Sequence, residues 1–279
     1  MIFASDLDQT LIYSPKSFRL LAEELAPAIT SIELYEGREI SFMADDAIAK
    51  LQAIVNHSFF VPATTRTIDQ YRRISLFHNK IKPAYVVVSN GGNLIINGNV
   101  DTDWQKNMAR KIIQLCLCAE DMLTSFKEFC HASWAGPIRM ADDLFYYCVV
   151  ERDKVPISEL ESFSLWAQAQ NWNVSLQGRK LYIVPQVVNK WAGVAHIREL
   201  LQEEIVVAAG DSLLDLCMLK QADYGIAPCH GELWDRYSRG ELIGQEIKFT
   251  NQAGILASND ILNYVDGQSK NNSICGKRA

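Results

Sequence analysis

Apolar residues in the first third of the chain fall into short continuous runs, which are typical of buried strands, and into longer stretches with helical spacing. The runs predict strands at residues 2–5, 59–63 and 84–88. The spaced stretches predict helices at residues 18–26, 44–56 and 68–77, with a hairpin around Gly37 at residues 32–43. Strands that alternate with helices indicate a doubly wound, mainly parallel α/β sheet.

The pattern changes in the middle of the chain, where hairpins and helices occur without regular alternation. Hairpins are expected at residues 93–100, 138–151 and 174–184, and helices at residues 104–129 and 158–170. Such a pattern favours an inserted α+β unit with an antiparallel sheet. Alternation then resumes, with helices at 190–201, 213–221 and 255–265 and strands at 205–209, 224–227 and 247–250.

These patterns divide the chain into three parts. The predicted α/β core comprises residues 1–92 and 185–265, and the inserted α+β unit comprises residues 93–184. The last stretch, 266–279, is polar and rich in Gly, Asn, Ser and Lys, so we expect it to be a flexible tail.

Two carboxylates, Asp6 and Asp8, follow the first apolar run directly. Ligands of parallel α/β sheets bind at the carboxyl ends of the strands. Two close carboxylates repel each other and are costly to desolvate, so their pairing favours a divalent metal site with one carboxylate free to act as a nucleophile. The plainer alternative is an acidic turn in which Thr10 caps the next helix.

Three further strand ends carry polar groups that should meet at the same edge of the sheet. They are Thr64 with Arg66, Asn90 with Gly91, and Asp211 with Asp215. Each set has an ordinary structural alternative: Thr64 and Asp211 could cap helices, and Arg66 could pair with a surface carboxylate. Lys190 is expected near a helix start, where a cation is unfavourable, and this misfit favours a functional role.

Composition limits the range of partners. The chain has 279 residues and a net charge of -6, which argues against nucleic acid or an anionic membrane as the main partner. No apolar run approaches the ~20 residues of a membrane-spanning helix. The seven cysteines are scattered and lack Cys-x-x-Cys spacing, so we expect reduced thiols in a cytoplasmic protein. The sequence leaves the oligomeric state open.

In their order and spacing, these motifs resemble those of haloacid dehalogenase superfamily phosphohydrolases. The resemblance is to subclass IIB, the Cof-type and sucrose-phosphate phosphatase-like enzymes, which carry a type C2 cap between their second and third motifs. The matching stretches are Asp6-Leu7-Asp8-Gln9-Thr10, Thr64 in Ala63-Thr64-Thr65-Arg66, Lys190 in Val188-Asn189-Lys190, and Gly210-Asp211-Ser212-Leu213-Leu214-Asp215. The family usually has Gly at the position of Thr65 and often Asn at that of Leu214, which bears on substrate range and rate.

The resemblance implies a Rossmann-like core, an α+β cap and Mg²⁺-dependent hydrolysis of a small phosphomonoester, such as a sugar or sugar-acid phosphate. It implies that Asp6 is the nucleophile that forms an aspartyl-phosphate, and that Asp8 is the general acid and base. Thr64 and Lys190 would stabilise the phosphoryl group. The implied metal ligands are Asp6, Asp8 through its backbone carbonyl, Asp211 and Asp215.

Substrate contacts are expected from Arg66, Asn90 and Gly91, and a cap contact from Arg179 is a further hypothesis, as is a substrate role for His230. Two other functions stay open from the sequence. A phosphomutase would use the same intermediate, and an inactive ligand-binding protein could share the fold.

Overall fold

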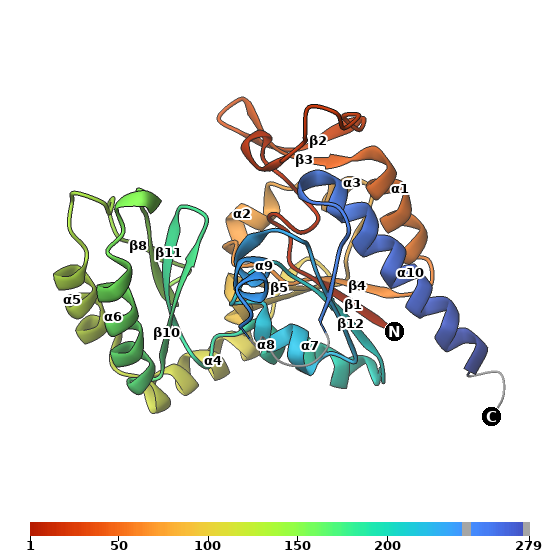
Figure 1. Ribbon diagram of the computed structural model, residues 1–279. Helices are drawn as coiled ribbons and strands as arrows, with labels where there is room; N and C mark the ends of the chain where they lie inside the picture. The colour runs from red at the N-terminus through yellow and green to blue at the C-terminus, as the bar shows by residue number, and fades with distance from the viewer. Residues whose placement is uncertain (242–246, 276–279) are drawn as a thin grey trace.

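The computed structural model describes residues 1–241 and 247–275 and contains a parallel sheet flanked by helices (Figure 1). Its strand order is β14-β13-β12-β1-β4, and all four pairings are parallel. The strands are β1 (Ile2–Ser5), β4 (Phe59–Pro62), β12 (Val206–Ala209), β13 (Tyr224–Ala227) and β14 (Lys248–Phe249). The predicted α/β fold class is therefore confirmed.

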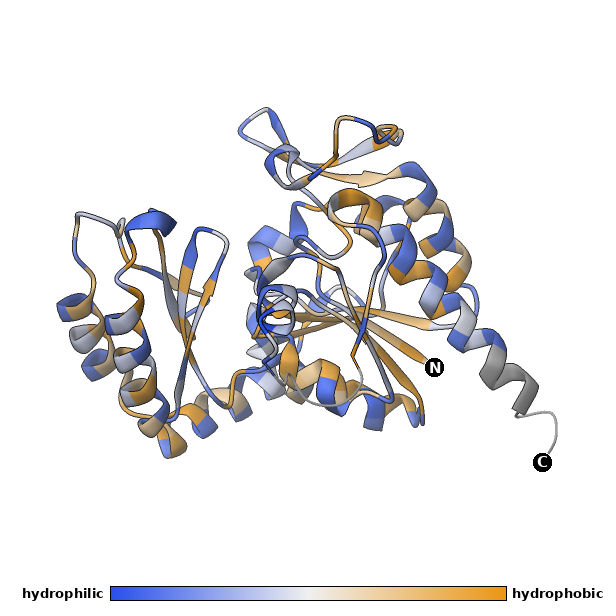
Figure 2. Ribbon diagram, viewed as in Figure 1, coloured by the Kyte–Doolittle hydropathy of each residue, from blue (hydrophilic) through white to orange (hydrophobic). Residues whose placement is uncertain are grey.

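Alternate residues of β1 pack on opposite faces of this sheet, as the period of two in a strand requires. Phe3 packs in an apolar cluster with α1 (Asp45–Ile54) and α10 (Ala257–Cys275). Ile2 and Ala4 pack in a second cluster with α7 (Lys190–Leu201) and α8 (Leu216–Gln221). Figure 2 shows the hydrophobic residues concentrated in the strands between these helices. The apolar run at residues 2–5 is thus the centre of a three-layer core.

Two hairpins adjoin the parallel sheet. The first, β2 (Ile29–Tyr35) with β3 (Arg38–Ala44), turns at Gly37 as predicted. In the second, β6 (Asn93–Ile96) and β7 (Asn99–Val100) pair antiparallel with β5 (Tyr85–Val88). A parallel bridge between Ala63 and Val87 connects β5 to the end of β4. The β6–β7 hairpin therefore extends the core sheet, and the predicted boundaries of the inserted unit, residues 93 and 184, stay a prediction.

A separate antiparallel sheet has the order β10-β11-β9-β8. Its strands are β8 (Arg139–Ala141), β9 (Phe145–Val149), β10 (Trp172–Gln177) and β11 (Lys180–Pro185). One face packs in an apolar cluster with α5 (Ala119–Phe129) and α6 (Ile157–Ala169). The other face presents Tyr147 and Tyr182 to the cluster of the core unit. This arrangement is the α+β lobe seen beside the core in Figure 1.

Several predicted helices are wrong in extent. Residues 18–26 form loops and turns after the 3₁₀ helix η1 (Pro15–Ser17), because Arg19 adopts a left-handed φ of 52°. Phe18 packs on the core, but Leu25, from the same expected apolar stripe, is 93% exposed. The helix predicted at 104–129 is two helices, α4 (Thr102–Leu115) and α5, which are separated by an extended Cys116. Next to Cys116, the carbonyl of Leu117 accepts a hydrogen bond from Trp172 Nε1 at 3.0 Å.

Other element boundaries also differ from the prediction. The stretch 68–77 is divided between α2 (Ile68–Arg72) and α3 (Leu76–Asn79), and α9 (Gly231–Ser238) was not predicted. Helix α10 continues to Cys275, so residues 266–275 are helical, while 276–279 of the predicted tail lie outside the described residues. The remaining short helices are η2 (Ser89–Gly91), η3 (Arg152–Lys154) and η4 (Gly254–Leu256). No helix among the described residues is long and apolar enough to span a membrane.

His230 connects two loops that lie at the edge of the parallel sheet. Its Nδ1 accepts a hydrogen bond from Gly254 N at 3.1 Å, so its Nε2 carries the proton and donates to the Gln9 carbonyl at 2.8 Å. Protonation of Nδ1 would place a proton against the Gly254 N–H. Burial lowers the pKa of His230 to about 4. The neutral ring is therefore a structural connection between the loop after β1 and the loop before α10.

This lowered pKa predicts a pH-dependent stability. Between its ordinary pKa of about 6.5 and its folded value of about 4, His230 is protonated in the unfolded chain only. The free energy of unfolding should therefore fall by about 3 kcal/mol as the pH falls from about 6.5 to about 4, and level off below that. Denaturant unfolding at a series of pH values should show this loss in the wild type and a shallower loss in His230→Gln.

The exposed His57 provides the matched control, because His57→Gln should keep the wild-type pH profile. An equal pH slope in His230→Gln and in the wild type would contradict the role assigned to His230.

Candidate active site

Residues that are far apart in the sequence converge at the carboxyl ends of the parallel strands. Asp6 follows β1, Asp211 lies just beyond β12, and Lys190 is the first residue of α7. Lys190 Nζ lies 2.6 Å from Asp6 Oδ1 and 2.5 Å from Asp215 Oδ1. Lys190 is only 1% exposed, so both ion pairs are buried. The sheet edge thus gathers the first, third and fourth motifs around a single lysine.

The carboxylates of Asp6, Asp211 and Asp215 form a compact buried cluster. One oxygen of each lies within 4.8 Å of the others. Burial raises the pKa of Asp6 to about 7, although Lys190 opposes the shift, and burial together with Asp6 raises the pKa of Asp211. No donor among the described residues bonds to the Asp211 carboxylate. Three carboxylates against one lysine leave an excess of negative charge, and hard oxygen ligands of this kind fit Mg²⁺.

Asp215 is the most completely bonded member of the cluster. Its Oδ1 accepts from Lys190, while its Oδ2 accepts from the Ser212 backbone N at 3.0 Å and from Ser212 Oγ at 2.7 Å. Gly210 allows this placement, because a Cβ there would lie 2.4 Å from the Asp215 Cβ. Asp215 therefore orients Lys190, and its free capacity for a metal ion is smaller than that of Asp6 or Asp211.

The carboxylate of Asp8 faces Arg66 instead of the cluster. Arg66 donates from Nε to Asp8 Oδ2 at 2.7 Å and from NH2 to Asp8 Oδ1 at 2.8 Å. The Asp8 side chain is 51% exposed, so the cost of partly removing it from water is small, and the Arg66 guanidinium holds the pKa of Asp8 below its usual value. Although the sequence suggested a substrate contact for Arg66, the structure gives it two carboxylate partners, Asp8 and Glu33.

Glu33 lies on β2 and was not identified from the sequence. It accepts hydrogen bonds from Arg66 NH1 at 2.7 Å, from Ser41 Oγ at 2.6 Å and from Arg73 Nε at 3.0 Å. Its side chain is fully buried between the two arginines. The only signal in the sequence was a charged residue between Ile32 and Leu34 in an apolar strand. Glu33 thus connects the β2–β3 hairpin to Asp8 through Arg66.

Asn90 and Gly91 are placed beneath α7, and they are absent from the described lining of the cavity beside Asp6. Asn90 Nδ2 donates to the Val188 carbonyl at 2.9 Å. Gly91 has a φ of 96°, and a Cβ there would lie 2.1 Å from the Asn189 carbonyl oxygen. Both residues therefore hold the start of α7, and so they position Lys190. Their predicted contact with substrate stays a prediction.

The other two sequence positions of interest are also buried. Thr64 Oγ1 accepts from Arg66 N at 3.1 Å, and its predicted contact with the phosphoryl group stays a prediction. Leu214, where the related families often have Asn, is 7% exposed and packs in the apolar cluster of α7 and α8. Leu214 therefore contributes apolar packing at this position.

A cavity of about 550 Å³ lies between these motifs and the antiparallel lobe. The core contributes Asp6, Asp8, Arg66 and Asp211, and the lobe contributes residues of β9 and of the β10–β11 hairpin, including Arg179, Lys180 and Tyr182. Gln177 Nε2 donates to Ser212 Oγ at 2.9 Å, so the hairpin contacts the fourth motif directly. Lys180 and Gln177 were missed from the sequence, because a hairpin turn carries no signal of what it faces.

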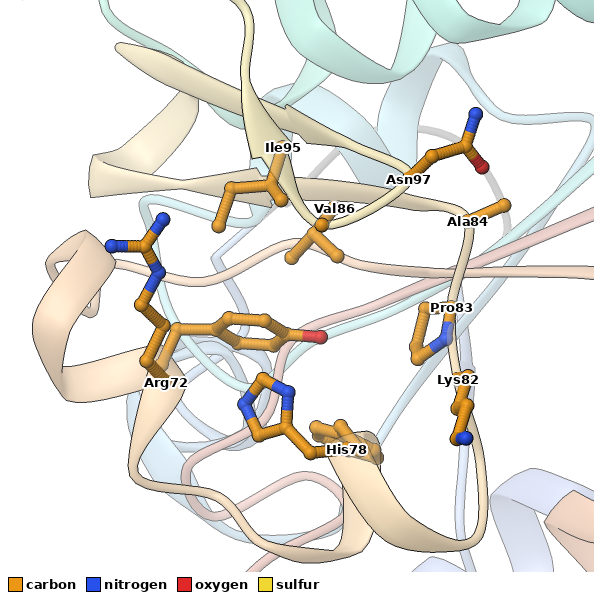
Figure 3. A pocket seen from close by; sticks show the side chains of 11 residues that line it. Arg72, His78, Lys82, Pro83, Ala84, Val86, Ile95 and Asn97 are labelled. Carbon is orange, nitrogen blue, oxygen red and sulfur yellow. The ribbon is translucent and has the colours of Figure 1, made fainter.

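A second cavity of about 380 Å³ lies elsewhere, between α2, α3 and the β5–β6 hairpin. Figure 3 shows Arg72, His78 and Lys82 around it, with Val86 and Ile95 behind them. None of the predicted site residues lines this cavity. The candidate active site is therefore the cavity that holds the carboxylate cluster.

The family model for haloacid dehalogenase-like hydrolases matches residues 146–228. No curated protein gives a significant match to the sequence. Among solved structures, the sucrose-phosphatase from Synechocystis is 13% identical, with a TM-score of 0.67 over 95% of this chain and 98% of that one. A subclass IIB sugar phosphatase is 13% identical, with a TM-score of 0.53 over 95% of this chain and 98% of that one.

The C-terminal domain of trehalose-6-phosphate phosphatase from C. albicans is 12% identical, with a TM-score of 0.53 over 95% of this chain and 91% of that one. At such identities these likenesses concern the fold. Together with the match over residues 146–228, they confirm that the chain resembles the haloacid dehalogenase superfamily and has its fold, a Rossmann-like core with an inserted α+β cap.

Proposed function

We propose that this protein is a Mg²⁺-dependent phosphatase that hydrolyses a small phosphomonoester through an aspartyl-phosphate on Asp6. The observation that carries the proposal is the buried cluster of Asp6, Asp211 and Asp215 around Lys190, which opens into the 550 Å³ cavity. A bare carboxylate and a phosphate dianion repel each other, so attack needs positive charge between them. Asp6 and Asp211, with the Asp8 backbone carbonyl, would hold Mg²⁺, which would supply that charge.

The first half-reaction transfers the phosphoryl group to the protein. An Asp6 oxygen bonds to phosphorus while the ester P–O bond breaks. Asp8, once its carboxylate has left Arg66 and taken up a proton from solvent, gives that proton to the leaving alkoxide. Lys190 and Thr64 stabilise the charge that develops on the phosphoryl oxygens. In the second half-reaction water attacks phosphorus, Asp8 takes its proton, and inorganic phosphate leaves. The pairing with Arg66 favours the ionised form of Asp8, which is the form that this second step needs.

The proposed substrate is a sugar or sugar-acid phosphate. The cavity volume suits a small metabolite. The similar structures include phosphatases named for sucrose and for trehalose-6-phosphate, which supports a phosphorylated sugar here. A phosphomutase would return the phosphoryl group to the substrate, so the product separates the two functions: free phosphate indicates a phosphatase, and an isomeric phosphate a mutase.

The first prediction concerns the nucleophile. Asp6→Asn should lower kcat by about 1,000-fold or more, because an amide does not form an acyl-phosphate. The variant should fold normally, since it removes one of several mutually repelling carboxylates. Phosphate release from a panel of phosphorylated metabolites, with thermal unfolding as the check on folding, measures both effects. Asp103→Asn, at a carboxylate that is 93% exposed on α4, is the matched control. Substantial turnover by a clean Asp6→Asn preparation would contradict the assignment of Asp6 as the nucleophile.

The second prediction concerns the metal ion. Treatment with EDTA should abolish turnover, and added Mg²⁺ should restore it. Ca²⁺ should support little activity, because it prefers more ligands at longer distances and would displace the attacking oxygen from phosphorus. Phosphate release after chelation and metal add-back tests this. Full activity of the rigorously chelated protein would refute the metal requirement.

A further inference from the structure

Three cations at the mouth of the active-site cavity have no carboxylate partner among the described residues. They are Lys16 on η1, Arg179 in the β10–β11 turn and Lys180 at the start of β11, and all three are exposed and line the cavity. The other cations differ, because Arg66 and Arg73 bond to the buried Glu33 and Lys190 bonds to the buried Asp6, each within 3.0 Å. The mouth therefore carries positive charge that the protein itself does not neutralise.

Lys180 is the best placed of the three. Its strand is held between β9 and β10, and its Nζ lies 5.8 Å from the centre of the Tyr147 ring, which stacks on Tyr182 at 5.9 Å. Lys180 and Asp8 line the same cavity. Because Asp8 serves the leaving-group oxygen in the proposed reaction, Lys180 faces the part of the substrate that departs.

The transferred phosphoryl group does not need these cations. In the proposed reaction Lys190 and Thr64, together with a Mg²⁺ ion that Asp6 and Asp211 would hold, would neutralise its charge at the carboxylate cluster. Positive charge at the leaving-group side therefore matches a different anion. We propose that the preferred substrate carries a second anionic group, a carboxylate or a second phosphate, on its leaving portion, and that Lys180, aided by Arg179 and Lys16, binds it. This inference rests on the proposed phosphatase function.

The test compares substrates that differ by a single anionic group. 3-Phosphoglycerate has a carboxylate where glycerol 3-phosphate has a hydroxymethyl group, and fructose 1,6-bisphosphate has a second phosphate that fructose 6-phosphate lacks. The wild type should prefer the more anionic member of at least one pair in kcat/KM, and the preferred pair identifies the group. Lys180→Gln should lower kcat/KM for that member about tenfold and change the other less than about twofold. Lys154→Gln, at an exposed lysine outside this cavity, should change neither.

An equal loss on both members of each pair would show that Lys180 only attracts phosphates in general, and would overturn the inference. So would the absence of any preference in the wild type. A binding measurement separates this inference from the proposed function. Calorimetry of Asp6→Asn with Mg²⁺ and each of the four compounds should show tighter binding of the more anionic member, and Asp6→Asn combined with Lys180→Gln should lose that difference. If the binding preference is found but the wild type shows no turnover, the proposed phosphatase function is refuted. If the wild type turns over substrate without the preference, only the inference of a second anionic group is refuted.

Discussion

The structure depends on holding three carboxylates, Asp6, Asp211 and Asp215, close together in a buried site with one lysine. Such a cluster costs free energy unless its members are positioned and neutralised. The backbone is adapted to it. Gly231 has a φ of 83°, and a Cβ there would lie 2.7 Å from Asp211 Oδ2. Asn90 and Gly91 fix the start of α7 and so bring Lys190 to Asp6. The cluster is thus a set of buried carboxylates that could hold a cation, and the surrounding backbone keeps it in place.

The antiparallel lobe contacts the core at two places. At one end, Asp142 Oδ2 accepts hydrogen bonds from Ile68 N at 2.9 Å and from Ser89 Oγ at 2.5 Å. Leu144 also packs against Gly92, in the space that a Cβ at that position would occupy. At the other end, Gln177 bonds to Ser212 beside the fourth motif. The lobe therefore contacts the core on either side of the cavity, and its β10–β11 hairpin forms part of the cavity wall.

Sequence patterns predicted what depends on local physics. The run at residues 2–5 could only be a buried strand, and the convergence of Asp6, Lys190 and Asp211 followed from the geometry of parallel strands. The predictions from sequence were wrong where tertiary contacts determine the local structure. The apolar spacing at 18–26 did not produce a helix, because Arg19 takes a left-handed φ and only Phe18 of the expected stripe packs on the core. Between the two halves of the helix predicted at 104–129, Leu117 accepts a hydrogen bond from Trp172. Glu33 and Lys180 belong to hairpins that pack against the site. No local sequence pattern shows which surface a hairpin will pack against.

The most direct measurement of the central claim is thermal unfolding with and without Mg²⁺. The excess negative charge of the cluster predicts that Mg²⁺ raises the unfolding midpoint of the wild type, because the ion binds the folded state only. Asp211→Asn should unfold at a higher temperature than the wild type in metal-free buffer, because it relieves repulsion, and should lose the response to Mg²⁺. A wild type that does not respond to Mg²⁺, or an Asp211→Asn variant that responds equally, would contradict the account.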